Sequence, residues 1–496
     1  MASRRLKPLR IPLDRAALEK ILGTPCRGTV GASPIQLLCR DHRQMPADLF
    51  VAIRGTQHDA SQFIDAVIDG GVCAIVTESE PLVDLPDDIV WWQVADARQA
   101  LAQLEQAGAG SPGSRLRIFG ITGTNGKSTT VRYLSNILEK AGHTVGWMTT
   151  VENKIGATRE PSRMTTQEPA RIASALARHL EGGGSDFVLE ISSHGIDQNR
   201  IGGLSLAAGA ITSLGRDHLD YHETIDRYHA TKESLQKFCD ADAPFVRPVS
   251  TAADSVGSVS LRFEVVGFGE AQAESIESTI TGQRARIRTP GFEGEVCLRQ
   301  PGRHNLSNAL VAIALAGAIG IDRTAIAAGI EKAEGVAGRL EEIEVEQGQV
   351  FVDFAHTPDA IDAVIASMRP LVRGRLMVLF GCGGERDRGK RSEMGASASK
   401  ADRLIVTSDN PRSEDPLHII EQIREGIVVG TDHIIEVDRR RAIQCAIEML
   451  EEDDVLLIAG KGHEQTQQSS GIEEPFDDRT VAREIIAARQ QGRIIG

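Results

Sequence analysis

Residues 120–130 read Gly-Ile-Thr-Gly-Thr-Asn-Gly-Lys-Ser-Thr-Thr, a glycine-rich turn between an apolar stretch and a helix-forming stretch. Residues 116–119 predict a strand before the turn, and residues 131–140 predict a helix after it. Such a turn directs backbone N–H groups at phosphate oxygens and places them at the positive end of a helix. Lys127 is suited to reach the β- and γ-phosphates, and the Ser128 hydroxyl is suited to Mg²⁺. The segment predicts an α/β domain that binds ATP or a related nucleotide.

The phosphate loop departs from the strict pattern at one position. A glycine is expected five residues before Gly126, and Ile121 stands there instead, so the loop has the shorter form that begins at Thr122. The alternative interpretation is a strand-to-helix turn that binds no phosphate.

Length, charge and cysteine content narrow the class of protein. A chain of 496 residues is too long for one core and suggests about three domains. The net charge of −14 and the lack of a basic tail argue against nucleic-acid binding. Seven cysteines without a CxxC pair favour reduced thiols in a cytoplasmic protein. The longest apolar run, 309–321, is too short for a bilayer and predicts a buried helix; no signal peptide or membrane contact is expected.

Strands and helices alternate along most of the chain, which predicts parallel sheets covered on both faces. The stretch 108–114 has the composition of a linker, and residues 244–300 form a more β-like piece. The predicted strands of the first and third blocks are 49–53, 74–76, 89–92, 349–353, 376–380, 403–407 and 455–459.

Two polar clusters follow the phosphate loop. Glu190 ends a predicted strand, where open α/β sheets bind ligands. His218 lies in the stretch Arg216-Asp-His-Leu-Asp-Tyr-His, and Lys232 lies in a helical segment after it. Carboxylate, hydroxyl and imidazole groups suit Mg²⁺, which needs few protein ligands. The alternatives are that His218 is a satisfied core histidine and that Lys232 is an exposed helix residue paired with Glu233.

Three polar loops follow predicted strands in the last third of the chain, at residues 381–391, 409–416 and 459–464. Loops at the carboxyl ends of parallel strands meet at one edge of the sheet, so they favour a single binding crevice. Glycine-rich turns with solvated charges are the alternative.

These motifs, in this order, resemble those of the Mur ligases. The matching segments begin at Thr122, Thr165, Ser192, Asp217, Gly302, Gly338, Val352, Phe380 and Gly460. The resemblance implies three α/β domains: an N-terminal uridine-binding domain over 1–112, a central P-loop-type parallel-sheet ATPase domain over 113–337, and a C-terminal Rossmann-like domain over 338–496. It implies a cytoplasmic, monomeric ligase with small-molecule partners and no nucleic acid or membrane.

The reaction implied by the resemblance begins with ATP phosphorylating the free carboxylate of UDP-N-acetylmuramoyl-L-Ala-D-Glu. The amine of an incoming amino acid then displaces phosphate from the acyl phosphate. A carboxylate is a poor electrophile at neutral pH, so phosphorylation supplies the leaving group, and the protein's task is positioning and charge stabilisation.

The resemblance also implies roles for individual residues. The nucleotide would be bound by Gly123, Thr124, Asn125, Gly126, Lys127, Ser128, Thr129, Asn305, Arg339 and Asp353. Two Mg²⁺ ions would be held by Ser128, Glu190, His218 and Lys232, with Lys232 carbamylated by CO₂ into an anionic oxygen donor. The groups acting in catalysis would be Lys127, Glu190, His218, Lys232 and Arg339.

On the substrate side, the muropeptide would be bound by Thr165, Thr166, Ser192, Gln198 and Arg200, and the uridine by Asp41 and Gln57. The amino acid would be bound by Arg386, Asp409, Asn410, Pro411, Arg412, Gly460 and Glu464.

Arg412 selects the amino acid in this interpretation. The stretch Asp409-Asn-Pro-Arg412 matches the members that add meso-2,6-diaminopimelate, whose extra carboxylate a guanidinium can grip with two charge-assisted hydrogen bonds. The alternatives are a lysine-adding ligase, a folylpolyglutamate synthetase-like enzyme and a non-catalytic nucleotide-binding regulator of the same fold.

Two motifs depart from the family. Members usually carry Asp-Ser-Arg near the first strand to hold the uridine, and here the aligned stretch reads Arg40-Asp-His-Arg. Members usually have proline after the paired threonines, and Gln167 stands here. The uridine contacts and the shape of the threonine loop are therefore expected to differ.

Overall fold

The computed structural model describes residues 8–28, 33–55, 59–80, 86, 88–162, 164–249 and 260–490. The chain divides into two compact units. The first comprises Met1–Thr122, Gly142–Gly209 and His229–Phe245, and the second comprises Gly123–Ala141, Ala210–Tyr228 and Val246–Gly496. Because this division runs through the middle of the chain, the domain boundaries expected after residues 112 and 337 stay predictions.

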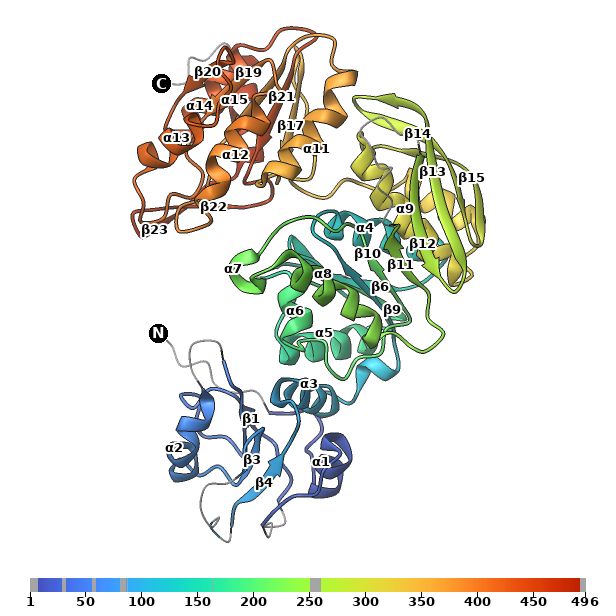
Figure 1. The fold of residues 1–496 in the computed structure, drawn as a ribbon. Helices are drawn as coiled ribbons and strands as arrows, with labels where there is room; N and C mark the ends of the chain where they lie inside the picture. Colours follow the sequence, from blue (N-terminus) through green and yellow to red (C-terminus); the bar gives the residue numbers. More distant parts are fainter. Residues whose placement is uncertain are drawn as a thin grey trace. The chain divides into compact units, whose positions relative to one another are not determined.

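The N-terminal part of the first unit is a parallel sheet with helices on both faces (Figure 1). Its strands, in sheet order, are β1 (Leu38–Cys39), β2 (Leu49–Ala52), β3 (Ala74–Thr77) and β4 (Val90–Gln93). Its helices are α1 (Arg15–Leu22), η1 (Ala60–Phe63), α2 (Ile64–Asp69), α3 (Ala97–Gly108) and η2 (Pro112–Ser114). Alternate residues of each strand face opposite sides, so Val51 packs with α1 and α3 while Phe50 packs with α2. The three strands predicted here are confirmed.

The rest of the first unit contains a second sheet, in which β5, β9 and β6 are parallel neighbours and β7 and β8 continue it antiparallel. These strands are β5 (Arg117–Thr122), β6 (Val145–Met148), β7 (Glu152–Ile155), β8 (Thr158–Pro161) and β9 (Asp186–Glu190). The helices around them are α5 (Pro169–Glu181), α6 (Ser193–Asp197) and η3 (Ser234–Phe238), together with the last part of α8 (Ile225–Glu233), whose first residues up to Tyr228 belong to the second unit. Helix α3 packs against α5, which joins this part to the N-terminal part.

The second unit begins with the helix of the phosphate loop, α4 (Lys127–Lys140), which packs against α9 (Arg303–Ala318) and α10 (Arg323–Glu331). Every residue from Ala309 to Ala316 is buried, so the long apolar run is a buried helix as expected.

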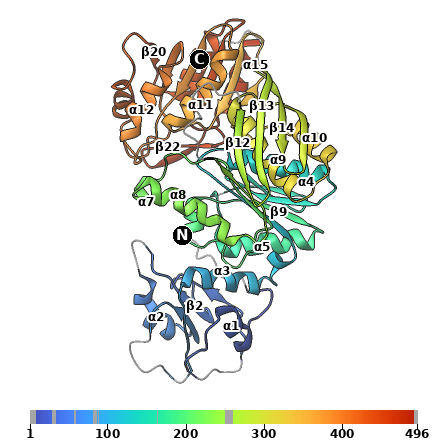
Figure 2. The same ribbon diagram turned by 45° about the vertical axis from the view of Figure 1, so that its right-hand side comes forward.

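An antiparallel meander confirms the β-like piece: β12 (Ser260–Val266), β13 (Gly269–Thr279), β14 (Gly282–Thr289) and β15 (Phe292–Leu298). Figure 2 shows β12, β13 and β14 side by side. Three short elements complete this region: β10 (Ala208–Ile211), α7 (Leu219–His222) and β11 (Phe245–Pro248).

The C-terminal part of the second unit is a six-stranded sheet in the order β16-β17-β21-β18-β19-β20, parallel except for β16. Its strands are β16 (Glu341–Ile343), β17 (Gln349–Asp353), β18 (Leu376–Phe380), β19 (Arg403–Val406), β20 (Asp432–Ile435) and β21 (Val455–Ala459). All four strands predicted for this block are confirmed. A small hairpin, β22 (Thr466–Ser469) and β23 (Ile472–Pro475), follows β21.

Helices cover both faces of this C-terminal sheet. One face packs against α11 (Pro358–Met368), α12 (Gly389–Ala398) and α13 (Pro416–Arg424), with η4 (Arg369–Leu371) after α11. The other packs against α14 (Arg439–Glu448) and α15 (Asp478–Gln490). With helices on both faces, the strands can be apolar throughout, which explains their unbroken hydrophobic sequences. In the part of the chain that the structure describes, no helix is long and apolar enough to cross a bilayer.

Candidate active site

The phosphate loop joins β5 to α4, as the sequence predicts, but the helix begins at Lys127 rather than at Val131. The helix begins early because Gly126, in the left-handed region at φ 86°, serves as its N-cap. Lys127 Nζ donates hydrogen bonds of 2.9 Å to the carbonyl oxygens of Gly123 and Thr124. The ammonium group therefore lies over the loop, and Ser128 and Thr129 are buried in the first turn of the helix.

The two glycines of the loop lie where no side chain fits. A Cβ on Gly126 would lie 2.0 Å from Asn308 Oδ1 on α9, and a Cβ on Gly123 would lie 2.0 Å from Thr212 Oγ1. The backbone N–H groups of Thr124 and Asn125 donate to the carbonyl and the hydroxyl oxygen of Ser213, at 3.0 and 2.9 Å. Close contact on both sides fixes the loop, which is the preorganisation that a phosphate site needs.

Tyr228 links His218 to this loop, because the two rings have centroids 6.3 Å apart. Tyr228, buried on α8, donates its hydroxyl hydrogen to Thr124 Oγ1 at 3.2 Å. The imidazole of His218 is 45% exposed, so the alternative of a satisfied core histidine is wrong. Its Nε2 lies 3.5 Å from Asp217 Oδ2. Burial raises the pKa of Asp217, but the charges of His218 and His356 and the backbone N–H of His218 outweigh burial and leave that pKa below its usual value.

Glu190 and Lys232 are buried polar groups of the first unit. Glu190, the last residue of β9, is 2% exposed and accepts hydrogen bonds of 2.8 Å from the backbone N–H and the hydroxyl of Thr150. Lys232 is 1% exposed, so the alternative of an exposed helix residue paired with Glu233 is wrong. The Thr150 hydroxyl lies 3.0 Å from Thr165 Oγ1, which links Glu190 to the predicted muropeptide residues.

The structure brings the predicted muropeptide residues together. Thr166 Oγ1 lies 3.2 Å from Ser192 Oγ and accepts a 2.8 Å hydrogen bond from the Ser192 backbone N–H. Ser192 is the N-cap of α6. Arg200 Nη1 donates to the carbonyl oxygen of Thr166 at 2.7 Å, and Arg200 Nη2 donates to Gln198 Oε1 at 2.9 Å. One hydrogen-bonded group therefore contains four of the five residues expected there, and Thr165 adjoins it.

Gln167 shapes this loop in place of the usual proline. Its buried side chain donates from Nε2 to Ser162 Oγ at 3.1 Å and to the carbonyl oxygen of Met164 at 2.9 Å. A proline could make neither hydrogen bond, so the amide replaces the rigidity of a ring with two specific contacts.

Of the two residues expected to contact the uridine, the structure describes Asp41. Gln57 lies outside the described residues. Both carboxylate oxygens of Asp41 accept from the Arg43 guanidinium at 2.8 Å, and these hydrogen bonds lower the pKa of Asp41. Next to Asp41, the His42 ring stacks on the Phe63 ring with centroids 3.8 Å apart.

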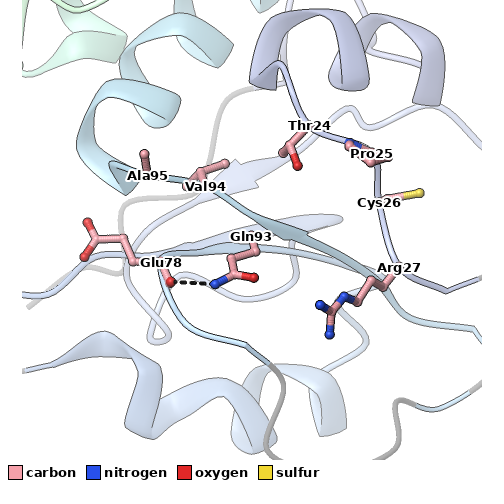
Figure 3. Close-up of a pocket in the computed structure, with 8 residues that line it drawn as sticks. All are labelled: Thr24, Pro25, Cys26, Arg27, Glu78, Gln93, Val94 and Ala95. Carbon is pink, nitrogen blue, oxygen red and sulfur yellow. Dashed lines mark hydrogen bonds between the residues drawn. The ribbon is translucent and has the colours of Figure 1, made fainter.

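The N-terminal sheet carries a pocket of about 570 Å³ beside the ends of β3 and β4 (Figure 3). Its lining residues are Thr24, Pro25, Cys26, Arg27, Glu78, Gln93, Val94 and Ala95. Gln93 Nε2 donates to the carbonyl oxygen of Glu78 at 3.4 Å across it. Asp41 does not line this pocket, so the pocket adds nothing to the predicted uridine contacts.

Glu105 on α3 offers a test of the packing near Arg40. Burial raises the pKa of Glu105 to about 7, although the charge of Arg40 opposes the rise. The unfolded chain gives up this proton near its ordinary pKa of 4.5, so stability falls as the pH rises from there to about 7 and then levels off. Replacing Glu105 by glutamine removes this loss.

We expect Glu105→Gln to gain stability relative to wild type as the pH rises: the difference between their free energies of unfolding should be roughly 3 kcal/mol larger at pH 8 than at pH 4.5, in favour of the variant. Urea denaturation at the two pH values measures this difference. Wild-type and variant stabilities that run parallel across the pH range would show that Glu105 titrates normally.

The loops after β19 and β21 bind each other in the C-terminal part. Lys461 Nζ is buried and donates to Asn410 Oδ1 at 3.2 Å, Glu464 Oε2 at 3.0 Å and the carbonyl oxygen of Thr466 at 2.8 Å. Asn410 Nδ2 also donates to Glu464 Oε2 at 2.8 Å. Gly460 has φ 110°, and a Cβ on it would lie 2.8 Å from Asp409 Oδ2. The structure therefore brings Asp409, Asn410, Gly460 and Glu464 together, as expected.

Arg412 connects the second of the three predicted loops to the first. Its guanidinium donates from Nη1 to the carbonyl oxygen of Gly384, and its backbone N–H donates to Gln468 on β22 at 3.0 Å. Gly384 lies so close to the buried Pro411 that a Cβ on it would lie 2.0 Å from the proline carbonyl oxygen. Arg386 is exposed on the same 381–391 loop. The three loops do meet at one edge of the sheet, which overturns the alternative of independent surface turns.

Two buried ion pairs support these loops, and the sequence did not reveal either. Arg391 is fully buried and donates from Nη1 and Nη2 to the two carboxylate oxygens of Glu414 at 3.0 Å. Hydrogen bonds from Arg391 lower the pKa of Glu414 to about 2. Arg439 and Asp478 form a bidentate pair at 2.8 and 2.7 Å, and Arg439 also donates to the carbonyl oxygens of Ser408 and Ala459. Those carbonyls immediately precede Asp409 and Gly460.

The remaining nucleotide candidates are Arg339, Asp353 and Asn305, and each of them contacts a neighbouring group of the second unit. The Arg339 guanidinium lies 4.5 Å from the centre of the Phe354 ring. Asp353 accepts hydrogen bonds of 2.7 Å from the backbone N–H groups of Leu340 and Ala355. Asn305 Nδ2 donates to the carbonyl oxygen of Pro301 at 2.8 Å. Asp353 thus fixes the backbone next to Arg339, while Asn305 belongs to the first turn of α9.

Among the described residues, no group of three or more His, Cys, Asp or Glu side chains is arranged to hold a metal ion. Mg²⁺ commonly takes one or two carboxylates together with water and phosphate oxygens. A carboxylate such as Glu190 suits that role, because two hydrogen bonds from Thr150 orient it.

Comparisons with known proteins identify the family and the relatives that this chain resembles over most of its length. Residues 121–316 match the family described as Mur ligase middle domain, and residues 338–462 match that described as Mur ligase, glutamate ligase domain. Relatives named UDP-N-acetylmuramoyl-L-alanyl-D-glutamate--2,6-diaminopimelate ligase include that of Alkaliphilus metalliredigens, 37% identical over 92% of this chain and 94% of the relative. That of Chlorobium phaeobacteroides is 36% identical over 94% of each. A solved structure of a ligase with this name is 26% identical with a TM-score of 0.64, covering 97% of this chain and 100% of the other.

Proposed function

Because this chain belongs to the Mur ligase family, we propose that it joins meso-2,6-diaminopimelate to the D-glutamate of UDP-N-acetylmuramoyl-L-Ala-D-Glu. ATP drives the reaction by phosphorylating the acceptor carboxylate. The proposal makes the protein a monomeric cytoplasmic enzyme that supplies precursors for peptidoglycan synthesis.

The observation that carries the choice of amino acid is the position of Arg412. Its guanidinium reaches across to Gly384 at the edge where the loops that contain Asp409, Gly460 and Glu464 meet. Diaminopimelate differs from lysine by a carboxylate at its far end, which the planar guanidinium can bind through two N–H groups. Glu464 and Asp409 supply carboxylates for the ammonium groups. Lysine would leave Arg412 facing an ammonium group, which is unfavourable.

The phosphate loop and Arg339 perform the charge stabilisation in this proposal. The phosphate loop, at the N-terminal end of α4, holds the phosphates together with Lys127, in line with the attacking carboxylate oxygen. Arg339 is suited to the negative charge that develops on the transferred phosphoryl group. Thr165, Thr166, Ser192, Gln198 and Arg200 hold the muropeptide so that its carboxylate points at that group.

Mg²⁺, when bound, would neutralise phosphate charge. Its proposed ligands are Ser128, Glu190, His218 and Lys232. An ammonium group repels a cation, so Lys232 suits this role only as a carbamate, which forms when the neutral amine adds to CO₂ and releases a proton. The burial of Lys232 supports this assignment, because a lysine with no role inside the protein is normally exposed.

The test is phosphate release from ATP in the presence of Mg²⁺ and UDP-N-acetylmuramoyl-L-Ala-D-Glu, comparing meso-diaminopimelate with L-lysine. We expect turnover that requires both the muropeptide and diaminopimelate, and little turnover with lysine. Turnover with lysine would retain the ligase and refute the role of Arg412. No turnover with either amino acid would favour a nucleotide-binding regulator of the same fold.

A further inference from the structure

Arg40 directly precedes the uridine candidate Asp41, and it makes an ion pair with Glu168, in the loop that carries the muropeptide candidates Thr165 and Thr166. It follows β1, and its Nη2 lies 2.8 Å from Glu168 Oε2. Glu168 is the residue after Gln167 and directly precedes α5. The ion pair therefore joins the N-terminal sheet to the loop that carries Thr165 and Thr166.

Glu168 lies between two guanidinium groups. Its Oε1 is 3.8 Å from Arg200 Nη2, a longer separation than the 2.8 Å that joins its Oε2 to Arg40. The Arg40 and Glu168 side chains are 48% and 34% exposed, whereas that of Arg200 is 16% exposed. Glu168 is thus held closely by the outer arginine and more loosely by the inner one.

Arg200 is also positioned by neutral partners. Nη1 donates to the carbonyl oxygen of Thr166 at 2.7 Å, and Nη2 donates to Gln198 Oε1 at 2.9 Å. These acceptors fix the plane of the guanidinium but leave its charge available. A carboxylate in full contact with Arg200 would neutralise it and compete with an anionic substrate for the same N–H groups.

We propose that Arg40 is a positioning residue for muropeptide binding, which holds Glu168 away from Arg200 and so keeps the Arg200 guanidinium available to the anionic substrate. This inference rests on the proposed function, because it takes Arg200 as a muropeptide contact. Glu105 is the other carboxyl group near Arg40, and burial raises its pKa to about 7; Glu168 is the carboxylate at ion-pair distance from Arg40.

Arg40→Ala tests the proposal through substrate kinetics. Without Arg40, Glu168 moves onto Arg200, and the KM for UDP-N-acetylmuramoyl-L-Ala-D-Glu is expected to rise roughly fivefold, the upper range for an ion pair of this exposure. The KM values for ATP and diaminopimelate, and kcat, are expected to stay within a factor of two. Arg40→Lys keeps the charge and should keep the muropeptide KM close to that of wild type.

A second substitution separates this role from a structural one. Adding Glu168→Gln to Arg40→Ala removes the competing carboxylate, so the muropeptide KM should return towards the wild-type value. A loop that had merely lost an anchor would not recover. Arg171→Ala is the matched control, because Arg171 on α5 makes a surface ion pair with Glu160 at 2.7 Å and is 44% exposed. The KM values of Arg171→Ala for the muropeptide, ATP and diaminopimelate should equal those of wild type.

Two outcomes would overturn the inference: an unchanged muropeptide KM in Arg40→Ala, or a raised KM that Glu168→Gln does not reverse. Either can occur while the wild-type enzyme turns over muropeptide and diaminopimelate, so neither affects the proposed function. A wild-type protein that neither binds the muropeptide in calorimetry nor turns it over would refute the proposed function, and this inference with it.

Discussion

Replacing Arg412 by alanine is expected to lower kcat/KM for meso-diaminopimelate by about 10²- to 10⁴-fold. Two charge-assisted hydrogen bonds to the distal carboxylate would be lost, each contributing roughly 1.5–3 kcal/mol, and every 1.4 kcal/mol corresponds to about tenfold. Activity with L-lysine, which lacks that carboxylate, should not fall. Steady-state phosphate release with each amino acid measures both effects.

The backbone at Arg412 makes this substitution interpretable. Arg412 has φ 54°, a left-handed conformation that costs alanine about as much as arginine, so the variant should fold as wild type does. Arg412→Lys keeps a positive charge but loses the planar guanidinium with its paired N–H donors. We expect its kcat/KM for diaminopimelate to lie between those of wild type and Arg412→Ala. Arg388→Ala is the control, because Arg388 is an exposed cation of the neighbouring loop whose partner is Glu414 at 3.5 Å. Diaminopimelate kinetics of Arg412→Ala close to those of wild type would remove Arg412 from the site.

Asp478→Asn is expected to destabilise the C-terminal sheet by roughly 3–5 kcal/mol, because it leaves the buried Arg439 without its carboxylate. Asparagine has almost the same shape, so the loss reports the charge rather than packing. Hydrogen exchange of the amides in β19 and β21 measures the effect locally, which avoids assuming two-state unfolding of a multidomain chain. The KM for diaminopimelate should rise as well, since Arg439 bonds the carbonyls of Ser408 and Ala459 next to the proposed site.

The same two helices provide the control for Asp478→Asn. Arg440 on α14 pairs with Glu484 on α15 at 2.8 Å, but this pair is about half exposed. Glu484→Gln removes an equivalent charge at the surface, and we expect a change of about 0.2–1 kcal/mol. If Asp478→Asn and Glu484→Gln lowered stability equally, the buried ion pair of Arg439 would contribute no more than the surface pair of Arg440.

Local sequence patterns predicted the strands of the C-terminal sheet closely, because strands with helices on both faces must be apolar throughout. Residues 349–353, 376–380 and 455–459 coincide with β17, β18 and β21. The start of α4 was predicted four residues late, because hydrophobic periodicity cannot show that Gly126 caps the helix from a left-handed conformation. The sequence therefore predicted which segments form helices and strands better than it predicted the residues at which they begin and end.

The supporting contacts of the site could not be predicted, because they join residues far apart in the chain. Arg391 belongs to a run of four cations that looks like a ligand-binding loop, but it is buried against Glu414, 23 residues away. Arg439 and Asp478 are 39 residues apart and belong to different helices. No local pattern marks either pair. Glu168 was missed for the same reason, since its partner Arg40 lies far away in the chain, beyond the phosphate loop.

The hydrogen bonds of Lys461 bear on how inhibitors of this enzyme should be designed. Lys461 joins Asn410, Glu464 and Thr466 through three hydrogen bonds, so the protein's own contacts order the proposed site. A flexible competitor would lose its own rotational freedom on entering such a pocket, whereas a ring-constrained analogue of diaminopimelate would have little left to lose. Constraint should therefore raise inhibitor potency more than added size.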